Sequence, residues 1–122
     1  MGLFSFGSKS QQNVKWVHFS NEQQLNQFIE ESKHRTIMFF KHSTRCSISS
    51  MAKSRIENDW DLDEEVTPIY VDLIANRNIS NLLADKFAVQ HESPQIILVR
   101  DGISIYDTSH NQISVGDIKN HL

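Results

Sequence analysis

The amino-acid sequence predicts an α/β fold with a mixed central sheet of four to five strands flanked by helices. Three observations support this prediction. Strand-like and helix-like patterns alternate along most of the chain, one strand-like segment is apolar throughout, and Asp101-Gly102 marks a hairpin near the end. Alternation of strands and helices implies parallel pairing with right-handed crossovers, and the hairpin adds antiparallel strands at one side of the sheet.

The first two elements are a short strand and an amphipathic helix. Residues 14–19 alternate apolar and polar side chains, which predicts the strand. Ser20 is the expected N-cap of the helix, because Gln23 three residues later completes a capping box. The helix is expected to end near residue 34. Its apolar positions, at helical spacing, are Leu25, Phe28 and Ile29.

The next segment is the expected centre of the sheet. Residues 37–40 are all apolar, as in a strand that is covered on both faces. Residues 41–44 follow as a short polar connection, and Ser43 or Thr44 is the expected N-cap of a second helix. The apolar positions of that helix are Ile48, Met51, Ala52 and Ile56.

The last third of the chain completes the sheet. Residues 68–72 predict a third strand, and a third amphipathic helix follows it. Residues 95–100 and 103–108 are the two strands of the hairpin that Asp101-Gly102 predicts. Ser114 is the expected N-cap of a short final helix. The apolar positions of the third helix are Ile79, Leu82, Leu83 and Phe87.

Length, charge and hydropathy limit the class of protein. A chain of 122 residues fits one domain, for which we expect residues 13–122, preceded by a flexible leader over residues 1–12. A formal charge of −3 gives no reason to expect a nucleic-acid or lipid partner. No apolar run approaches the roughly 20 residues that span a bilayer, and the start of the chain lacks the pattern of a secretory signal. We therefore expect a cytoplasmic protein without nucleic-acid or membrane partners.

Cys46 is the single cysteine of the chain, so neither an internal disulfide nor a multi-cysteine metal site can form within it. Such a thiol is either a buried structural residue or a reactive one. The predicted elements place Cys46 in the first turn of a helix, where unpaired amide groups and the helix dipole favour an anion such as a thiolate. Arg45 adds positive potential, whereas Lys41 and His42 fit a solvated loop better than a functional role.

The histidines do not indicate a metal site. They are scattered along the chain and lack the spacing of known ligand motifs. We therefore expect no metal ion. The six are His18, His34, His42, His91, His110 and His121.

A family resemblance rests on two motifs. Cys46-Ser47-Ile48-Ser49 has the spacing of the thioredoxin CxxC motif with serine in place of the second cysteine, and Ser93-Pro94 lies where thioredoxin-fold proteins hold a cis-proline. Residues 39–49 resemble the monothiol bacilliredoxins of low-GC Gram-positive bacteria, whose motif usually reads T-C-P-I-S. Ser47 departs from this motif, since it occupies the position of the proline. The similarity extends from the first strand to the final helix.

The resemblance implies a thioredoxin-like fold and a monothiol disulfide oxidoreductase that acts in redox homeostasis under oxidative stress. Such an enzyme removes bacillithiol from protein mixed disulfides, with Cys46 as the nucleophile. Bacillithiol is then a co-substrate, no cofactor is bound, and the partners are bacillithiolated client proteins. Because Ser49 cannot resolve the adduct, bacillithiol or a second redoxin must do so.

The same resemblance implies which residues contact the substrate. Ser49 could also donate a hydrogen bond to the Cys46 sulfur, and a cis bond before Pro94 would turn the Ser93 backbone toward an extended substrate segment. The expected substrate-binding residues are Thr44, Arg45, Ser49, Ser93 and Pro94.

Two alternative functions remain open from the sequence. The domain could be a non-catalytic binding module, or two chains could share an iron–sulfur cluster through Cys46 as monothiol glutaredoxins with a CGFS motif do. Ser47-Ile48 in place of Gly-Phe counts against the cluster. In a third possibility Cys46 is a structural core thiol without redox chemistry.

Overall fold

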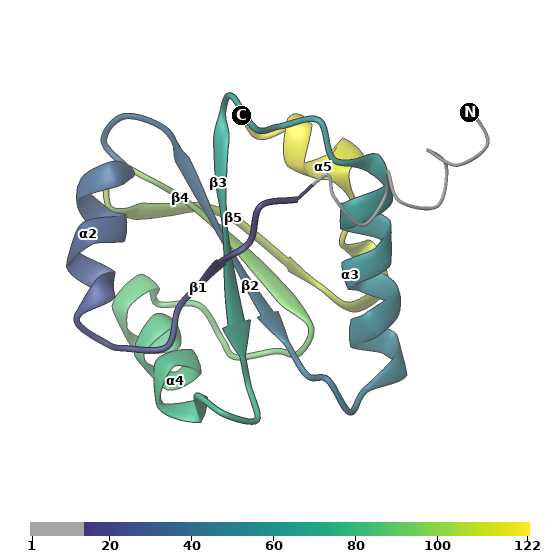
Figure 1. Ribbon diagram of the computed structural model, residues 1–122. Helices are drawn as coiled ribbons and strands as arrows, with labels where there is room; N and C mark the ends of the chain where they lie inside the picture. Colours follow the sequence, from purple (N-terminus) through teal and green to yellow (C-terminus); the bar gives the residue numbers. More distant parts are fainter. Residues whose placement is uncertain (1–13) are drawn as a thin grey trace.

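The protein forms a five-stranded mixed sheet with helices on both faces, which confirms the predicted fold class (Figure 1). The computed structural model describes residues 14–122, so the predicted leader over residues 1–12 lies outside the described residues. The strands are β1 (Val17–His18), β2 (Thr36–His42), β3 (Val66–Asp72), β4 (Gln95–Arg100) and β5 (Ile103–Ser109). The helices are α2 (Gln24–Glu31), α3 (Ser47–Asp59), α4 (Arg77–Phe87), the 3-10 helix η1 (His110–Gln112) and α5 (Val115–Lys119).

β2 is the central strand, in the order β1-β3-β2-β4-β5. It pairs in parallel with β3 and antiparallel with β4, and β4 and β5 form the terminal hairpin. All seven residues of β2 are buried. The apolar run therefore predicted its central place correctly, since only a strand covered on both faces can be apolar throughout.

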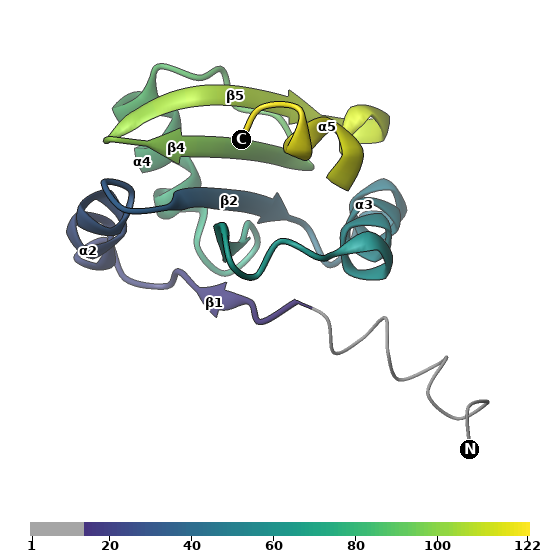
Figure 2. The same ribbon diagram turned by 90° about the horizontal axis from the view of Figure 1, so that it is seen from above.

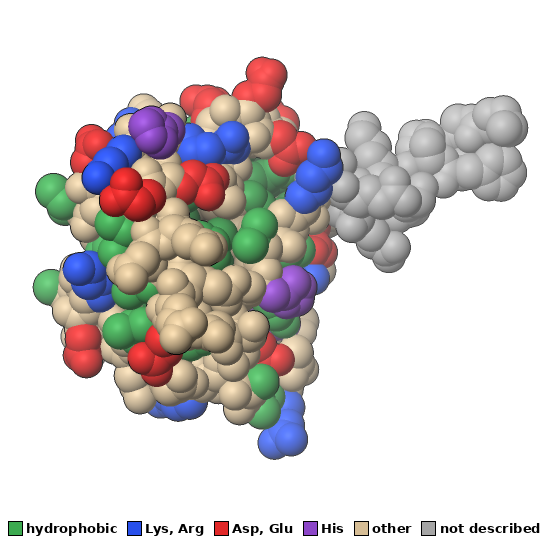
Figure 3. All heavy atoms as spheres, turned by 60° about the vertical axis from the view of Figure 1, so that its left-hand side comes forward, with side chains coloured by type: hydrophobic (Ala, Val, Ile, Leu, Met, Phe, Trp, Pro, Cys, Tyr) green, Lys and Arg blue, Asp and Glu red, His purple; other side chains and the backbone are tan. Residues whose placement is uncertain are grey.

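The helices divide into two layers. α2 and α4 cover one face of the sheet, and α3 and α5 cover the other (Figure 2). Side chains of β2 alternate between them: Ile37 and Phe39 pack in the cluster of α2 and α4, whereas Met38 and Phe40 pack in that of α3 and α5. The surface over α2 and α4 mixes acidic, basic and apolar side chains (Figure 3). None of the helices in residues 14–122 is long and apolar enough to cross a membrane.

Two local sequence signals of the C-terminal third are confirmed. Asp101 and Gly102 both have a positive φ, 53° and 73°, as a two-residue hairpin turn requires. The Ser114 hydroxyl accepts the backbone N–H of Asp117 at 3.1 Å and so caps α5. Both signals depend only on neighbouring residues, which is why the sequence predicts them well.

The predicted start of the first helix is wrong. α2 begins at Gln24, and Ser20 does not cap it. Instead the Gln24 side-chain oxygen accepts the backbone N–H groups of Ser20 at 2.9 Å and Asn21 at 3.0 Å, which fixes the chain before the helix. The preceding strand is also shorter than predicted, because only residues 17–18 pair with β3.

The prediction that Lys41 and His42 form a solvated connection is also wrong, because both are buried residues of β2. Lys41 is 0% exposed, and its Nζ lies 3.3 Å from His91 Nδ1. The Ser80 hydroxyl contacts the same nitrogen at 3.0 Å. Burial, and to a lesser extent the positive charge of Arg77, lowers the pKa of Lys41 from 10.5 to about 8.

The burial of Lys41 predicts how stability depends on pH. The folded protein releases this proton at a lower pH than the unfolded chain, so the cost of the buried ammonium is fully present below about pH 8 and is relieved toward pH 10.5. The free energy of unfolding of the wild type, relative to Lys41→Met, should therefore rise over this interval by up to roughly 3 kcal/mol. Urea unfolding of both proteins at several pH values measures this difference. A difference independent of pH would contradict the prediction.

Candidate functional site

Cys46 lies where the chain leaves β2 and enters α3. It is itself the N-cap of α3, with an extended backbone (φ −112°, ψ 122°), so the predicted cap at Ser43 or Thr44 is wrong. The Cys46 N–H donates to the Ser43 carbonyl at 3.2 Å, and the Cys46 carbonyl accepts the Ser50 N–H at 3.1 Å. A turn closed at Ser43 therefore precedes the helix and delays its start to Ser47.

The Cys46 thiol is free and partly exposed. It belongs to neither of the two hydrophobic clusters that form the core. The free amide groups of the first turn of α3 point toward this end of the helix, where they favour negative charge. The position is therefore that of an accessible thiol and argues against a structural core cysteine.

Ser49 connects the first turn of α3 to the end of β2. Its side chain is fully buried. The hydroxyl oxygen accepts the backbone N–H of Ser43 at 3.0 Å and lies 2.6 Å from His42 Nδ1. The hydrogen bond expected from Ser49 to the Cys46 sulfur is not formed, because the hydroxyl is engaged by these two groups instead.

His42 lies beneath the site on the α3 side of the sheet. Its ring stacks on Phe40 with centroids 5.5 Å apart and lies 5.6 Å from Tyr70. Burial, followed by the positive charge of Lys53, lowers the pKa of His42 below its usual value of 6.5. The imidazole is therefore neutral at pH 7, and its hydrogen bond with Ser49 joins two uncharged groups.

Pro94 lies at the same end of the sheet as Cys46. The Ser93–Pro94 bond is cis, as predicted. Gln95 pairs with Lys41 in the antiparallel ladder, so Pro94 follows directly beyond the end of that ladder. Pro94 is buried and Ser93 is half-buried. Two distant segments of the chain thus meet at the carboxyl end of β2.

The remaining predicted contact residues, Thr44 and Arg45, are exposed in the turn before Cys46. Arg45 forms no ion pair with any residue in 14–122. Its guanidinium is therefore available to an anionic group near the thiol. Over the same residues, no three His, Cys, Asp or Glu side chains converge so that they could hold a metal ion.

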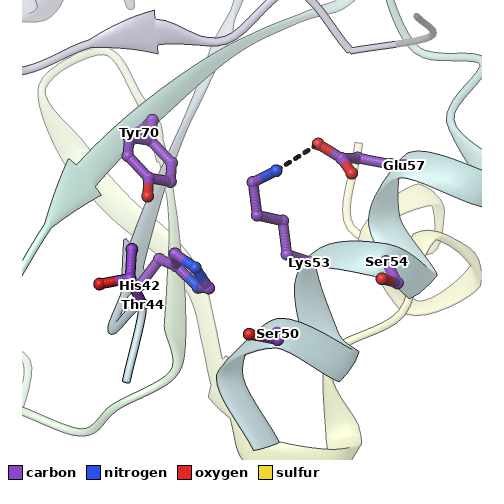
Figure 4. Close-up of a pocket in the computed structure, with 7 residues that line it drawn as sticks. All are labelled: His42, Thr44, Ser50, Lys53, Ser54, Glu57 and Tyr70. Carbon is purple, nitrogen blue, oxygen red and sulfur yellow. Dashed lines mark hydrogen bonds and ion pairs between the residues drawn. The ribbon is translucent and has the colours of Figure 1, made fainter. Parts of the chain in front are cut away.

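A polar pocket of about 370 Å³ adjoins this turn on the flank of α3 that faces β3 (Figure 4). Lys53 and Glu57 form an ion pair of 2.7 Å in it, and Glu57 also accepts the Trp16 indole N–H at 2.8 Å. No pattern in the sequence predicted this pocket. The i,i+4 spacing of Lys53 and Glu57 was the available signal, but it is common on exposed helix faces. The other lining residues are His42, Thr44, Ser50, Ser54 and Tyr70.

Apolar side chains are exposed near the thiol as well. Ile48 is 44% exposed and Met51 59% exposed on the first turns of α3. Ile74, in the loop after β3, is 45% exposed. Ile48 and Met51 follow Cys46 within the first turns of α3, and large apolar side chains exposed beside a reactive group are typical of a protein-binding surface.

Comparison with known structures identifies the fold. A solved structure described as an oxidoreductase with a thioredoxin fold superposes with a TM-score of 0.77 at 27% identity, over 92% of this chain and 96% of that chain. Fasciola hepatica thioredoxin superposes with a TM-score of 0.68 at 21% identity, over 86% and 98% of the two chains. Malassezia sympodialis thioredoxin gives 0.69 at 17% identity, over 85% and 88%.

Comparison with protein families identifies the branch of this fold. The model of the family described as monothiol bacilliredoxin BrxC matches residues 17–118. The match runs from β1 into α5 and includes both Cys46 and the cis-proline at position 94. The chain therefore belongs to the monothiol bacilliredoxin family of thioredoxin-fold, thiol redox proteins.

Proposed function

We propose that this protein removes bacillithiol from mixed disulfides on client proteins, with Cys46 as the nucleophile. The observation that carries the proposal is the position of Cys46, the single cysteine of a monothiol bacilliredoxin, partly exposed at the N-terminus of α3. We place this activity in the cytoplasm, where reducing conditions keep a lone thiol free.

The proposed reaction is one thiol–disulfide exchange. The Cys46 thiolate attacks the bacillithiol sulfur of the mixed disulfide, and the bond between that sulfur and the client sulfur breaks. The electron pair of this bond leaves with the client cysteine as a thiolate, and a new disulfide joins Cys46 to bacillithiol. The client is reduced and Cys46 is oxidised, so no further oxidant or reductant enters this step.

The surroundings of Cys46 support this step. The first-turn amides of α3 favour the attacking anion, as does Arg45, which has no ion-pair partner among residues 14–122. The exposed apolar side chains of Ile48, Met51 and Ile74 offer contact area to a client protein. The half-buried Ser93 beside Pro94 is our candidate for backbone pairing with an extended client segment.

The adduct on Cys46 requires an external thiol. Position 49 carries a hydroxyl, which cannot form a disulfide, and the chain has no other cysteine. A second bacillithiol or another redoxin would therefore attack the Cys46 adduct and release the free thiol. In this proposal bacillithiol is a co-substrate and no cofactor is bound.

The proposal predicts the fate of bacillithiol in a transfer experiment. A bacillithiolated client protein is mixed with reduced wild type or with Cys46→Ala, and both products are weighed by mass spectrometry. With the wild type, the client should lose the adduct and Cys46 should gain it in equal amount. With Cys46→Ala, the client should keep its adduct.

Two outcomes would contradict the proposal, one in this experiment and one in a reconstitution with iron and sulfide. If the client keeps its adduct while wild-type Cys46 remains free, exchange does not occur and the domain acts as a binding module. If the protein, reconstituted anaerobically with iron and sulfide, is coloured and fails to accept bacillithiol, the cluster carrier is the better assignment.

Replacement of Ser49 should affect the stability of the fold rather than the chemistry of Cys46. Ser49→Ala removes the acceptor of the partly buried Ser43 N–H and a partner of the buried His42, which should lower the free energy of unfolding by about 1–3 kcal/mol. Ser50→Ala is the matched control, because Ser50 is exposed and its hydroxyl has no protein partner in residues 14–122. Urea unfolding measures both changes. Equal stabilities of the two variants would show that Ser49 does not hold the turn.

A further inference from the structure

Several hydroxyl groups line the pocket between α3 and β3. Within residues 14–122, the hydroxyls of Thr44, Ser50, Ser54 and Tyr70 form no hydrogen bond with another protein group. Ser50, Lys53 and Glu57 of α3 lie toward His42 and Tyr70, and Ser54 lies farther back on the helix (Figure 4). A ligand that offers several hydroxyl groups could therefore pair with all of them.

The charges that line the pocket compensate one another. Lys53 and Glu57 are paired at 2.7 Å, and the Trp16 indole holds the carboxylate in place. Burial and the nearby carboxylates of Asp72 and Glu57 raise the pKa of Tyr70, so its phenol remains a donor at neutral pH. The lining therefore suits an uncharged polar group better than a phosphate.

The pocket adjoins the turn that carries the thiol. Thr44 precedes Cys46 by two residues, and the Ser50 N–H donates to the Cys46 carbonyl. Ser50 lies about 6 Å along the helix from Cys46. A group of the size of a monosaccharide, attached to the Cys46 sulfur through a short linker, would span this distance.

The two flanks of α3 differ in chemistry. Glu57 binds Trp16, so this flank faces β1 and β3. Arg55 donates to the carbonyls of Ile113 and His110, so the opposite flank faces η1, and the exposed Met51 lies one turn before it. Ser50 and Ser54 line both the polar pocket and a more apolar hollow with Met51 and Arg55, so these adjoining surfaces of α3 could receive different parts of one substrate.

We propose that the pocket between α3 and β3 is the subsite for the polyhydroxylated, sugar-like body of the small thiol that Cys46 accepts. The client protein then occupies the apolar flank around Met51. This inference rests on the proposed function, and it adds that recognition of the small thiol depends on the side chains of this pocket.

The test compares two small thiols on Cys46 of the full-length protein. Wild type is equilibrated with bacillithiol and cysteine, each in mixture with its own disulfide, and intact mass spectrometry gives the ratio of the two Cys46 adducts. Cysteine is the comparison probe because it has the thiol without the sugar-like body. Since the two thiols also differ in charge, the pocket variants show how much of the preference comes from the pocket. The wild type should favour the bacillithiol adduct, and Tyr70→Phe and Ser54→Ala should each reduce this preference about fivefold, the effect of one hydrogen bond.

Tyr106→Phe is the control for Tyr70→Phe, because Tyr106 stacks on His121 away from the pocket and should keep the full preference. If the wild type forms both adducts without preference, or if Tyr70→Phe keeps the preference, the subsite is refuted while exchange at Cys46 stands. If neither adduct forms on Cys46, the proposed function fails together with the subsite.

Discussion

The site depends on the Ser49 hydroxyl, which joins the end of the central strand to the start of the helix that carries the thiol. This hydroxyl accepts the Ser43 N–H and contacts His42, and both Ser49 and His42 are buried. The turn that holds Cys46 is closed over this contact. Ser49, which stands at the position of the second cysteine of a CxxC motif, therefore stabilises the turn that holds Cys46.

The polar end of β2 places different groups on the two faces of the sheet. Lys41 points to the side of α4, where it meets His91 in the segment before Pro94. His42 points to the side of α3, beneath Tyr70 and behind Ser49. Both directly follow the four buried apolar residues 37–40 of the same strand. Two buried polar residues at its end thus connect the core to the proline segment and to the thiol turn.

The sequence predicted the parts of the fold that depend on neighbouring residues or on one dominant pattern. The apolar run of β2, the Asp101-Gly102 turn and the cap at Ser114 are of this kind. The sequence did not predict features that depend on contacts between residues far apart in the chain. Lys41 reads as the start of a loop because its burial depends on His91, 50 residues later. The sequence did not predict the pocket for the same reason, since Tyr70 lies in β3 and other lining residues lie in α3.

The two predicted motifs differ from the pocket residues in how far the sequence alone could identify them. Cys46 and Pro94 are recognisable because their roles depend on the residue type itself: a thiol, and an imino acid that accepts a cis bond. Ser54 and Tyr70 have side chains that are common on any surface, and only their convergence gives them meaning. In our proposal the small thiol and the client bind to adjoining surfaces of α3. Ser50 and Ser54 lie where the polar pocket meets the exposed Met51.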